Sequence, residues 1–291
     1  MPHGLDHIVH AVRDLDAAAE VYRRAGFTVG ARNRHPWGTH NRIVQLKNCY
    51  IEILEVAEPG KIVPHGAGSF SFGAYQRDFL ASREGFSMLI LNSSDAALDA
   101  LALETSGIGN SGVFDFAREG KKPDGTPVKL AFSLAFASDA ASSNVRFALC
   151  QHHFPQNFWD PAFQNHPNGA KAVAGAVMVA DSPTDHHIFL KAFTGLSDLH
   201  STSIGVRART DNGDIEIMEP VSFCDEFGVS PDVDAAGMTL NGLRFQVADI
   251  AQAEALHRQS AIVSQRRVGR LVVPPNVAYG ATLIFESAKE G

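Results

Sequence analysis

A pattern of four related units is the feature that most limits how this chain can fold. The segments LDHIVHAV (5–12) and LNGLRFQV (240–247) each have the composition of a strand, followed within two residues by an aspartate and then by a helical segment. The segments YIEILE (50–55) and DIEIME (214–219) match in the same way at the ends of two units. Short strands often look alike by chance, but likeness at the same place in each unit indicates an internal repeat.

The first unit shows the order of elements most clearly. A strand over residues 7–12 precedes a helix that Asp14 or Asp16 would cap and that ends at Ala25, with Gly26 at the position where helices commonly place glycine. Strand-like segments follow at 27–31, 41–46 and 49–56. The predicted fold is therefore α+β, built from four tandem βαβββ modules of about 70–75 residues each, a length that suits one supersecondary motif.

The predicted domains follow from these modules. The first domain, residues 1–153, contains modules at 4–58 and 84–153, separated by an inserted loop at 59–83 that has no periodicity. The second, residues 172–291, contains modules at 172–221 and 239–288. We expect the first module to pair with the second. The aromatic, turn-rich segments 59–83 and 154–171 are either plain connections or lids over a cleft.

Composition excludes several classes of function. The net charge of −7 and the absence of a basic run argue against a nucleic-acid partner. No apolar run approaches the roughly 20 residues that cross a bilayer, and the first residues lack a basic and apolar leader. Three cysteines without metal-ligand spacing are typical of reduced thiols, which predicts a cytoplasmic protein.

Three short motifs resemble one superfamily. They are the Asp6-His7 dipeptide on the first strand, Ile51-Glu52-Ile53-Leu54 on the last strand, and Gly38-Thr39-His40-Asn41 between them. With four βαβββ units, they make the chain similar to the vicinal oxygen chelate superfamily, and more narrowly to its glyoxalase-like members. The resemblance implies paired modules whose curved mixed sheets enclose a cavity. It also implies a divalent metal held by the first and last strands, although some members are metal-free drug-binding proteins.

Strand alternation selects two candidate ligands for that metal. On the first strand, His7 shares a face with Val9, whereas His10 lies on the opposite face and is expected to be a hydrogen-bonded core residue. On the last strand, Ile51 would pack on the helix and leave Glu52 in the cavity. Since the superfamily places these strands side by side, His7 and Glu52 are expected about 5 Å apart across the ladder.

The second unit supplies the third candidate ligand. If Phe147 and Leu149 face the core, Cys150 and His152 face the cavity, and His152 takes the ligand position of the last strand. A register change of one residue would put His153 there instead. Two histidines and a carboxylate suit Fe, Mn, Zn, Ni or Co. Units three and four have glycine near the position of His7 and are expected to be structural.

The remaining site candidates surround the glycine-containing turn before residue 41. His40 is the candidate for proton transfer, unless this stretch is only a turn into an edge strand. Trp37, Asn41, Arg42 and Trp159 are candidate substrate contacts, since amide and guanidinium groups bind carbonyl or carboxylate oxygens.

Two functions remain after this step. The first is a metal-dependent enzyme of the lyase, isomerase or dioxygenase type, which acts on a small molecule by chelating two neighbouring oxygens. The alternative is a metal-free protein that binds a small molecule in the same cavity. A homodimer is compatible with either function.

Overall fold

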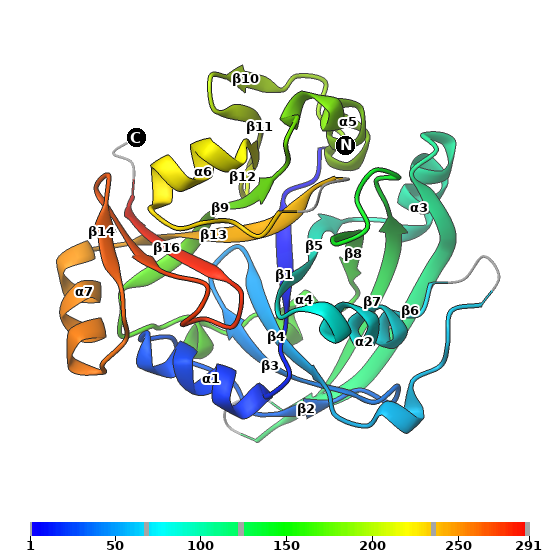
Figure 1. Cartoon of the computed structure of the whole chain (residues 1–291). Coiled ribbons are helices and arrows are strands. Elements are labelled where there is room, and N and C mark those ends of the chain that lie inside the picture. Colours follow the sequence, from blue (N-terminus) through cyan, green and yellow to red (C-terminus); the bar gives the residue numbers. More distant parts are fainter. Residues whose placement is uncertain (1, 67–69, 122–124, 234–236, 289–291) are drawn as a thin grey trace.

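The computed structural model describes residues 2–66, 70–121, 125–233 and 237–288, and these contain sixteen strands, seven α-helices and three short 3-10 helices (Figure 1). No described helix is long and apolar enough to span a membrane. The strands form two curved eight-stranded layers that are joined where β13 meets β5. The architecture is the predicted α+β class.

The first layer combines the first two units. Unit one contains β1 (Leu5–Ala11), α1 (Leu15–Arg24), β2 (Asn33–Arg34), β3 (Thr39–Gln45) and β4 (Tyr50–Val56). Unit two contains β5 (Gly85–Ser93), α3 (Ala96–Thr105), β6 (Gly109–Lys121), β7 (Pro127–Ala137) and β8 (Arg146–His152). In each unit the last strand runs parallel to the first. The antiparallel β1–β5 ladder joins the two units, so the predicted pairing of unit one with unit two is confirmed.

The second layer repeats this arrangement. Unit three contains β9 (Ala170–Val179), a 3-10 turn (Pro183–His186), α5 (His187–Thr194), β10 (His200–Thr202), β11 (Gly205–Thr210) and β12 (Gly213–Met218). Unit four contains β13 (Thr239–Val247), α7 (Ile250–Gln259), β14 (Gln265–Arg267), β15 (Arg270–Val273) and β16 (Thr282–Ser287). The β9–β13 ladder joins them as β1–β5 joins the first pair.

Alternation along the strands divides the core. Ile8 and Ile51 enter a large cluster that also takes in helix residues and the outward face of the second layer, including Leu243. Val9, Tyr50 and their neighbours form a separate cluster on the concave side of the first layer. Each fully buried aliphatic or aromatic side chain contributes roughly 1.5–3 kcal/mol, so a one-residue slip of register would be costly.

Three connections differ from the sequence-based expectation. Residues 27–31 were predicted to be a strand but form none, because Phe27 turns into the core against Phe245, with ring centroids 4.9 Å apart. The inserted loop 59–83 contains a 3-10 turn (Pro59–Lys61) and α2 (Phe72–Ser82), which Ser71 caps. Phe72, Tyr75 and Phe79 of α2 follow the i, i+3, i+7 spacing of a helix, which the expectation of a loop without periodicity missed.

Shorter helices occupy the remaining connections. Residues 154–171 contain α4 (Pro155–Phe158) and a 3-10 turn (Pro161–Phe163). The segment after unit three contains α6 (Pro220–Phe227), whose Phe223 and Phe227 fill the concave side of the second layer. The first layer keeps an open cavity on the corresponding side, which places the candidate site there.

Candidate active site

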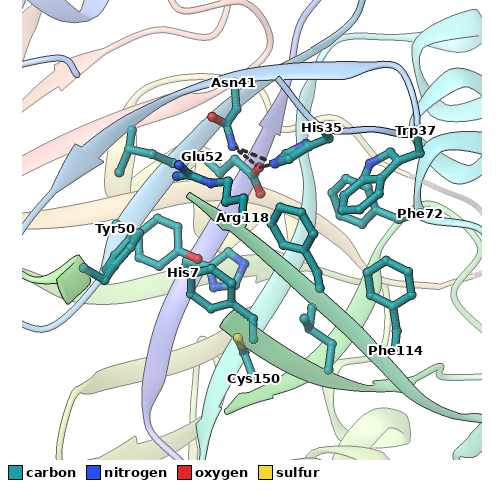
Figure 2. Close-up of a pocket in the computed structure, with 15 residues that line it drawn as sticks. His7, His35, Trp37, Asn41, Tyr50, Glu52, Phe72, Phe114, Arg118 and Cys150 are labelled. Atoms are coloured by element: carbon teal, nitrogen blue, oxygen red, sulfur yellow. Dashed lines mark hydrogen bonds and ion pairs between the residues drawn. The ribbon is translucent and has the colours of Figure 1, made fainter. Parts of the chain in front are cut away.

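The cavity of the first layer is lined mainly by aromatic side chains, with a few polar groups among them (Figure 2). Its volume is about 70 Å³. Since one water needs roughly 10–15 Å³ of such space, the cavity has room for several waters or a small molecule. The lining consists of His7, His35, Trp37, Asn41, Ile43, Tyr50, Glu52, Phe72, Phe114, Phe116, Arg118, Phe132, Leu134, Cys150 and Phe158.

A buried carboxylate joins two histidines at one end of this cavity. Oδ2 of Asp6 lies 2.6 Å from Nδ1 of His7, and Oδ1 lies 3.1 Å from Nε2 of His152. Burial alone would raise the pKa of Asp6, but His152 and His7 hold it well below its usual value. Because an ionised carboxylate only accepts hydrogen bonds, both imidazoles donate to it. Asp6 therefore fixes the tautomer and orientation of both rings.

The second nitrogen of each imidazole is left unengaged. No hydrogen bond to Nε2 of His7 occurs within the described part of the chain, and the ring stacks on Tyr50 with centroids 4.4 Å apart. Nδ1 of His152 is buried and likewise has no partner among the described residues. That ring is surrounded by aromatic side chains, and Trp159 stacks on it at 5.9 Å.

A second polar group holds the carboxylate of Glu52. Nδ2 of Asn41 donates to Oε1 of Glu52 at 2.5 Å and lies 3.3 Å from Nε2 of His35. Nδ1 of His35 lies 2.8 Å from Oγ1 of Thr39, and its ring stacks on Trp37 at 4.7 Å (Figure 2). Burial lowers the pKa of His35 more than Glu52 raises it. His35 is therefore a neutral imidazole, and Glu52 keeps Oε2 free of described partners.

Four of the eight predicted site residues line the cavity, namely His7, Trp37, Asn41 and Glu52. His152 and Trp159 pack behind its wall through the aromatic contacts above. His40 and Arg42 alternate with Asn41 and face away. Nε2 of His40 meets Glu58 at 3.3 Å, and Arg42 pairs with Asp16 at 2.9 Å. Two imidazoles line the cavity, those of His7 and His35.

The strand register differs from the expectation in two places. His7 is opposite Tyr50, and Glu52 is opposite Val9, so the two candidate ligands are diagonal rather than directly across the ladder. In unit two the residues equivalent to His7 and Glu52 are Met88 and Ala148, as the N-cap residues and the parallel β5–β8 ladder show. His152 lies beyond the equivalent position, at the strand end that reaches Asp6.

The group of possible metal ligands that lies closest together also differs from the predicted one. Among the described residues, Asp6, His7 and Cys150 are the group whose ligand atoms all lie within 4.8 Å of one another. Alternation places Asp6 away from the cavity, but a register irregularity between Leu5 and His7 redirects it. The sequence did carry one signal for a role of Asp6 in the site, namely its place in the Asp6-His7 motif. His35 lies two residues before Trp37 in the stretch that the sequence marked, but no sequence signal marked Arg118.

The corresponding region of the second layer is closed by charge pairing. Glu216, the counterpart of Glu52, is buried and lies 2.7 Å from Nε of Arg207 and 3.1 Å from Arg244. Gly175 stands near the position of His7, and a side chain there would meet Arg244 at 2.8 Å. These contacts support the predicted structural role of units three and four.

The fold and the cavity together define a class of protein whose paired βαβββ modules enclose a small-molecule site. Residues 5–194 match the family model described as "Glyoxalase-like domain", and the chain belongs to this family. The resemblance to the vicinal oxygen chelate superfamily is thereby confirmed. A comparison with curated protein sequences finds no match.

Three solved structures share the fold. A hypothetical protein from Staphylococcus aureus is 13% identical over 98% of this chain and 100% of its own, with a TM-score of 0.66. A xylose isomerase-like TIM barrel/4-hydroxyphenylpyruvate dioxygenase fusion protein is 12% identical, with a TM-score of 0.54. The match covers 100% of this chain and 49% of that protein. A mutant 4-hydroxymandelate synthase from Streptomyces coelicolor is 10% identical over 100% of this chain and 94% of its own (TM-score 0.53). At these identities the likeness establishes the fold alone.

Proposed function

We propose that this protein is a metal-dependent enzyme of the glyoxalase or dioxygenase type, which acts on a small molecule in the cavity of the first layer. The reaction would be of the lyase, isomerase or dioxygenase class, on a substrate with two neighbouring oxygens. The observation that carries the proposal is the shared carboxylate. Asp6 holds His7 and His152 through one nitrogen each, and each ring keeps its other nitrogen unengaged.

The donor set suits a divalent cation in residue type, although the ligand atoms of His7, Glu52 and His152 do not form a group within 4.8 Å of one another in the described part of the chain. Metal-binding histidines usually donate their second N–H to a carboxylate, which is the arrangement of His7 and His152 around Asp6. Glu52 is oriented by Asn41 in the same way and has a free oxygen. We propose His7, Glu52 and His152 as the ligands, which suit Fe, Mn, Zn, Ni or Co. When bound, such an ion would polarise the two substrate oxygens as a Lewis acid.

The residues around the cavity would perform the remaining tasks. The rings of Trp37, Phe72 and Phe114 exclude water and provide an apolar wall for the substrate. We propose His35, in place of His40, as the group that accepts a proton, which it would do at Nε2 after the 3.3 Å contact of that atom with Asn41 is broken. Asn41 would keep Glu52 and His35 in fixed relative positions.

The proposal is tested by metal content and metal affinity. Protein as purified should contain a divalent ion, and after chelation it should bind Zn²⁺ or Mn²⁺ in a calorimetric titration. His7→Ala and Glu52→Gln should abolish this binding, and Asp6→Asn should weaken it about 10- to 100-fold, because the carboxylate orients both rings. His200→Ala, which changes an exposed histidine on β10, is the matched control. Absence of metal binding, or unchanged affinity of His7→Ala, contradicts the proposal.

A second candidate function is favoured by the substitutions in unit two. Met88 and Ala148 occupy the positions equivalent to His7 and Glu52, so the site has fewer donors than two complete modules would supply. Together with the aromatic wall, this favours a metal-free protein that binds a small aromatic molecule. Thermal shifts that respond to aromatic ligands and not to metals would support this candidate.

We also propose that the protein works in a reducing, cytoplasmic environment. Cys49 and Cys150 are free and buried, and Cys224 is free and partly buried. Cys150 lines the cavity, where oxidation would change the site. Light scattering would measure whether the chain forms the homodimer that remains compatible with this fold.

A further inference from the structure

Arg118 is the one arginine or lysine among the described residues that line the candidate cavity. It extends from β6 toward Glu52 and is half-buried (Figure 2). No described carboxylate lies within 4.0 Å of its guanidinium group, and its hydrogen bond in the described chain is to the carbonyl of Glu119, at 3.3 Å. Arg32 and Arg270, which are also half-buried, do have such carboxylates, whereas the guanidinium of Arg146 lies over the rings of Phe70 and Tyr75.

The Arg118 guanidinium has no direct ion pair in the described part of the chain, and Glu52 acts on it only from across the same cavity, so a ligand carboxylate can still compensate its charge. Burial lowers the pKa of Arg118, and the nearby carboxylate of Glu52 offsets this only in part. A guanidinium presents a planar pair of N–H donors that matches a carboxylate, and such charge-assisted pairs are strong in a dry site. A phosphate dianion would favour a second cation, which the lining does not supply.

The position of Arg118 indicates where a carboxylate bound to it would lie relative to the rest of a ligand molecule. Arg118, Ile43 and Phe158 line both the candidate cavity and a neighbouring cavity of about 130 Å³. The neighbouring cavity includes Asn33, Asn157 and Asp160 and is more polar than the first. Arg118 therefore stands where the aromatic chamber meets the more polar one.

We infer that Arg118 binds a carboxylate of the substrate, so that the substrate is an amphipathic carboxylic acid whose apolar part packs against the phenylalanines of the first chamber. The inference rests on the proposed function only in placing the substrate in this cavity. It does not require the metal.

A pair of probes of equal shape tests this inference. Binding of 3-phenylpropanoate and of its neutral amide, 3-phenylpropanamide, would be measured by calorimetry with and without a chelator. The wild-type protein should bind the acid about tenfold more tightly, which corresponds to roughly 1.4 kcal/mol. Arg118→Gln should reduce the affinity for the acid to that for the amide. Arg118→Lys should retain part of the preference, since it keeps the charge but not the planar donor pair.

The controls separate this inference from the proposed metal site. Arg258→Gln changes an exposed arginine on α7 and should leave both affinities unchanged. If the preference for the acid vanishes on chelation and persists in Arg118→Gln, a metal holds the carboxylate and the inference is wrong. Equal affinity for the two probes, or no binding of the acid, also contradicts it. If the purified wild-type protein neither contains nor binds a metal but still prefers the acid to the amide, the proposed function is wrong and this inference stands.

Discussion

Two histidines of one strand, His7 and His10, have very different surroundings and chemistry. His7 and His10 both lie on β1, but His7 faces the cavity and donates to an ionised carboxylate. His10 is buried on the other face, where Nδ1 lies 2.9 Å from the hydroxyl of Tyr22 and Nε2 lies 2.9 Å from the carbonyl of Tyr279. The predicted core role of His10 is confirmed. Its hydrogen bonds connect the first strand to the last unit of the chain.

The buried imidazole of His10 makes stability depend on pH. Burial lowers the pKa of His10 to about 4, and its hydrogen bond to Tyr279 opposes this only in part. The unfolded chain, with a histidine pKa of about 6.5, binds the proton first, so stability is highest above about 6.5 and falls as the pH decreases toward 4. We expect a loss of about 3 kcal/mol over this range.

Urea unfolding at a series of pH values measures this effect. His10→Gln keeps an amide near both partners but cannot titrate, so its stability should change less between pH 6.5 and 4. His65→Gln, on an exposed side chain, is the control and should follow the wild type. Equal slopes for His10→Gln and wild type would contradict the assignment of this pH dependence to His10.

At the scale of elements, the repeat extends to how each helix begins. Asp14, Asp95 and Asp249 cap α1, α3 and α7, and each carboxylate accepts from the backbone of the first turn. Unit three has Ser182 at this place, and its side chain makes no capping hydrogen bond. The helix of unit three accordingly begins as a 3-10 turn before α5.

These caps give a matched comparison. Asp95→Ala should lower the free energy of unfolding by about 1 kcal/mol, because two backbone N–H groups, of Ala97 and Leu98, lose their acceptor. Ser182→Ala should change it by much less, since no such bond is lost. Urea denaturation of both variants at pH 7 measures the difference. Equal losses would show that the aspartate does not act as a cap.

At the scale of the molecule, the two layers share one core. Phe27 of the first unit packs against Phe245 and Phe285 of the fourth, with ring centroids 4.9 and 5.8 Å away. Nδ1 of His186 lies 2.6 Å from Asp139, which ties the third unit to the connection between β7 and β8. Because one apolar cluster includes residues of all four units, neither layer buries its outer face alone.

The shared core predicts cooperative unfolding. Phe245→Ala in the second layer should cost about 3–5 kcal/mol. Both tryptophans, Trp37 and Trp159, pack on the concave side of the first layer, so their fluorescence reports on the layer that does not contain Phe245. We expect fluorescence and circular dichroism to shift together to lower urea concentration. Val221→Ala, at an exposed position on α6, should shift neither probe, and separate midpoints for the two probes would contradict a shared core.

The sequence by itself determined the repeating architecture and the inward faces of its strands. Periodicity of two identifies which side chains share a face, and it placed His7 and Glu52 correctly on the cavity side. Periodicity could not determine the register between strands that are distant in the chain. In the structure Tyr50, and not Glu52, stands opposite His7.

Tertiary structure alone decided which polar groups meet. The register irregularity in β1 brings Asp6 to His152, although 146 positions separate them in the chain. Likewise the fold turns Arg118 of β6 toward the chamber that contains Glu52. Local patterns fix which face a residue occupies, whereas long-range pairing and bulges fix its neighbours. The chemistry of this site depends on those neighbours, because they determine the orientation and charge of each group.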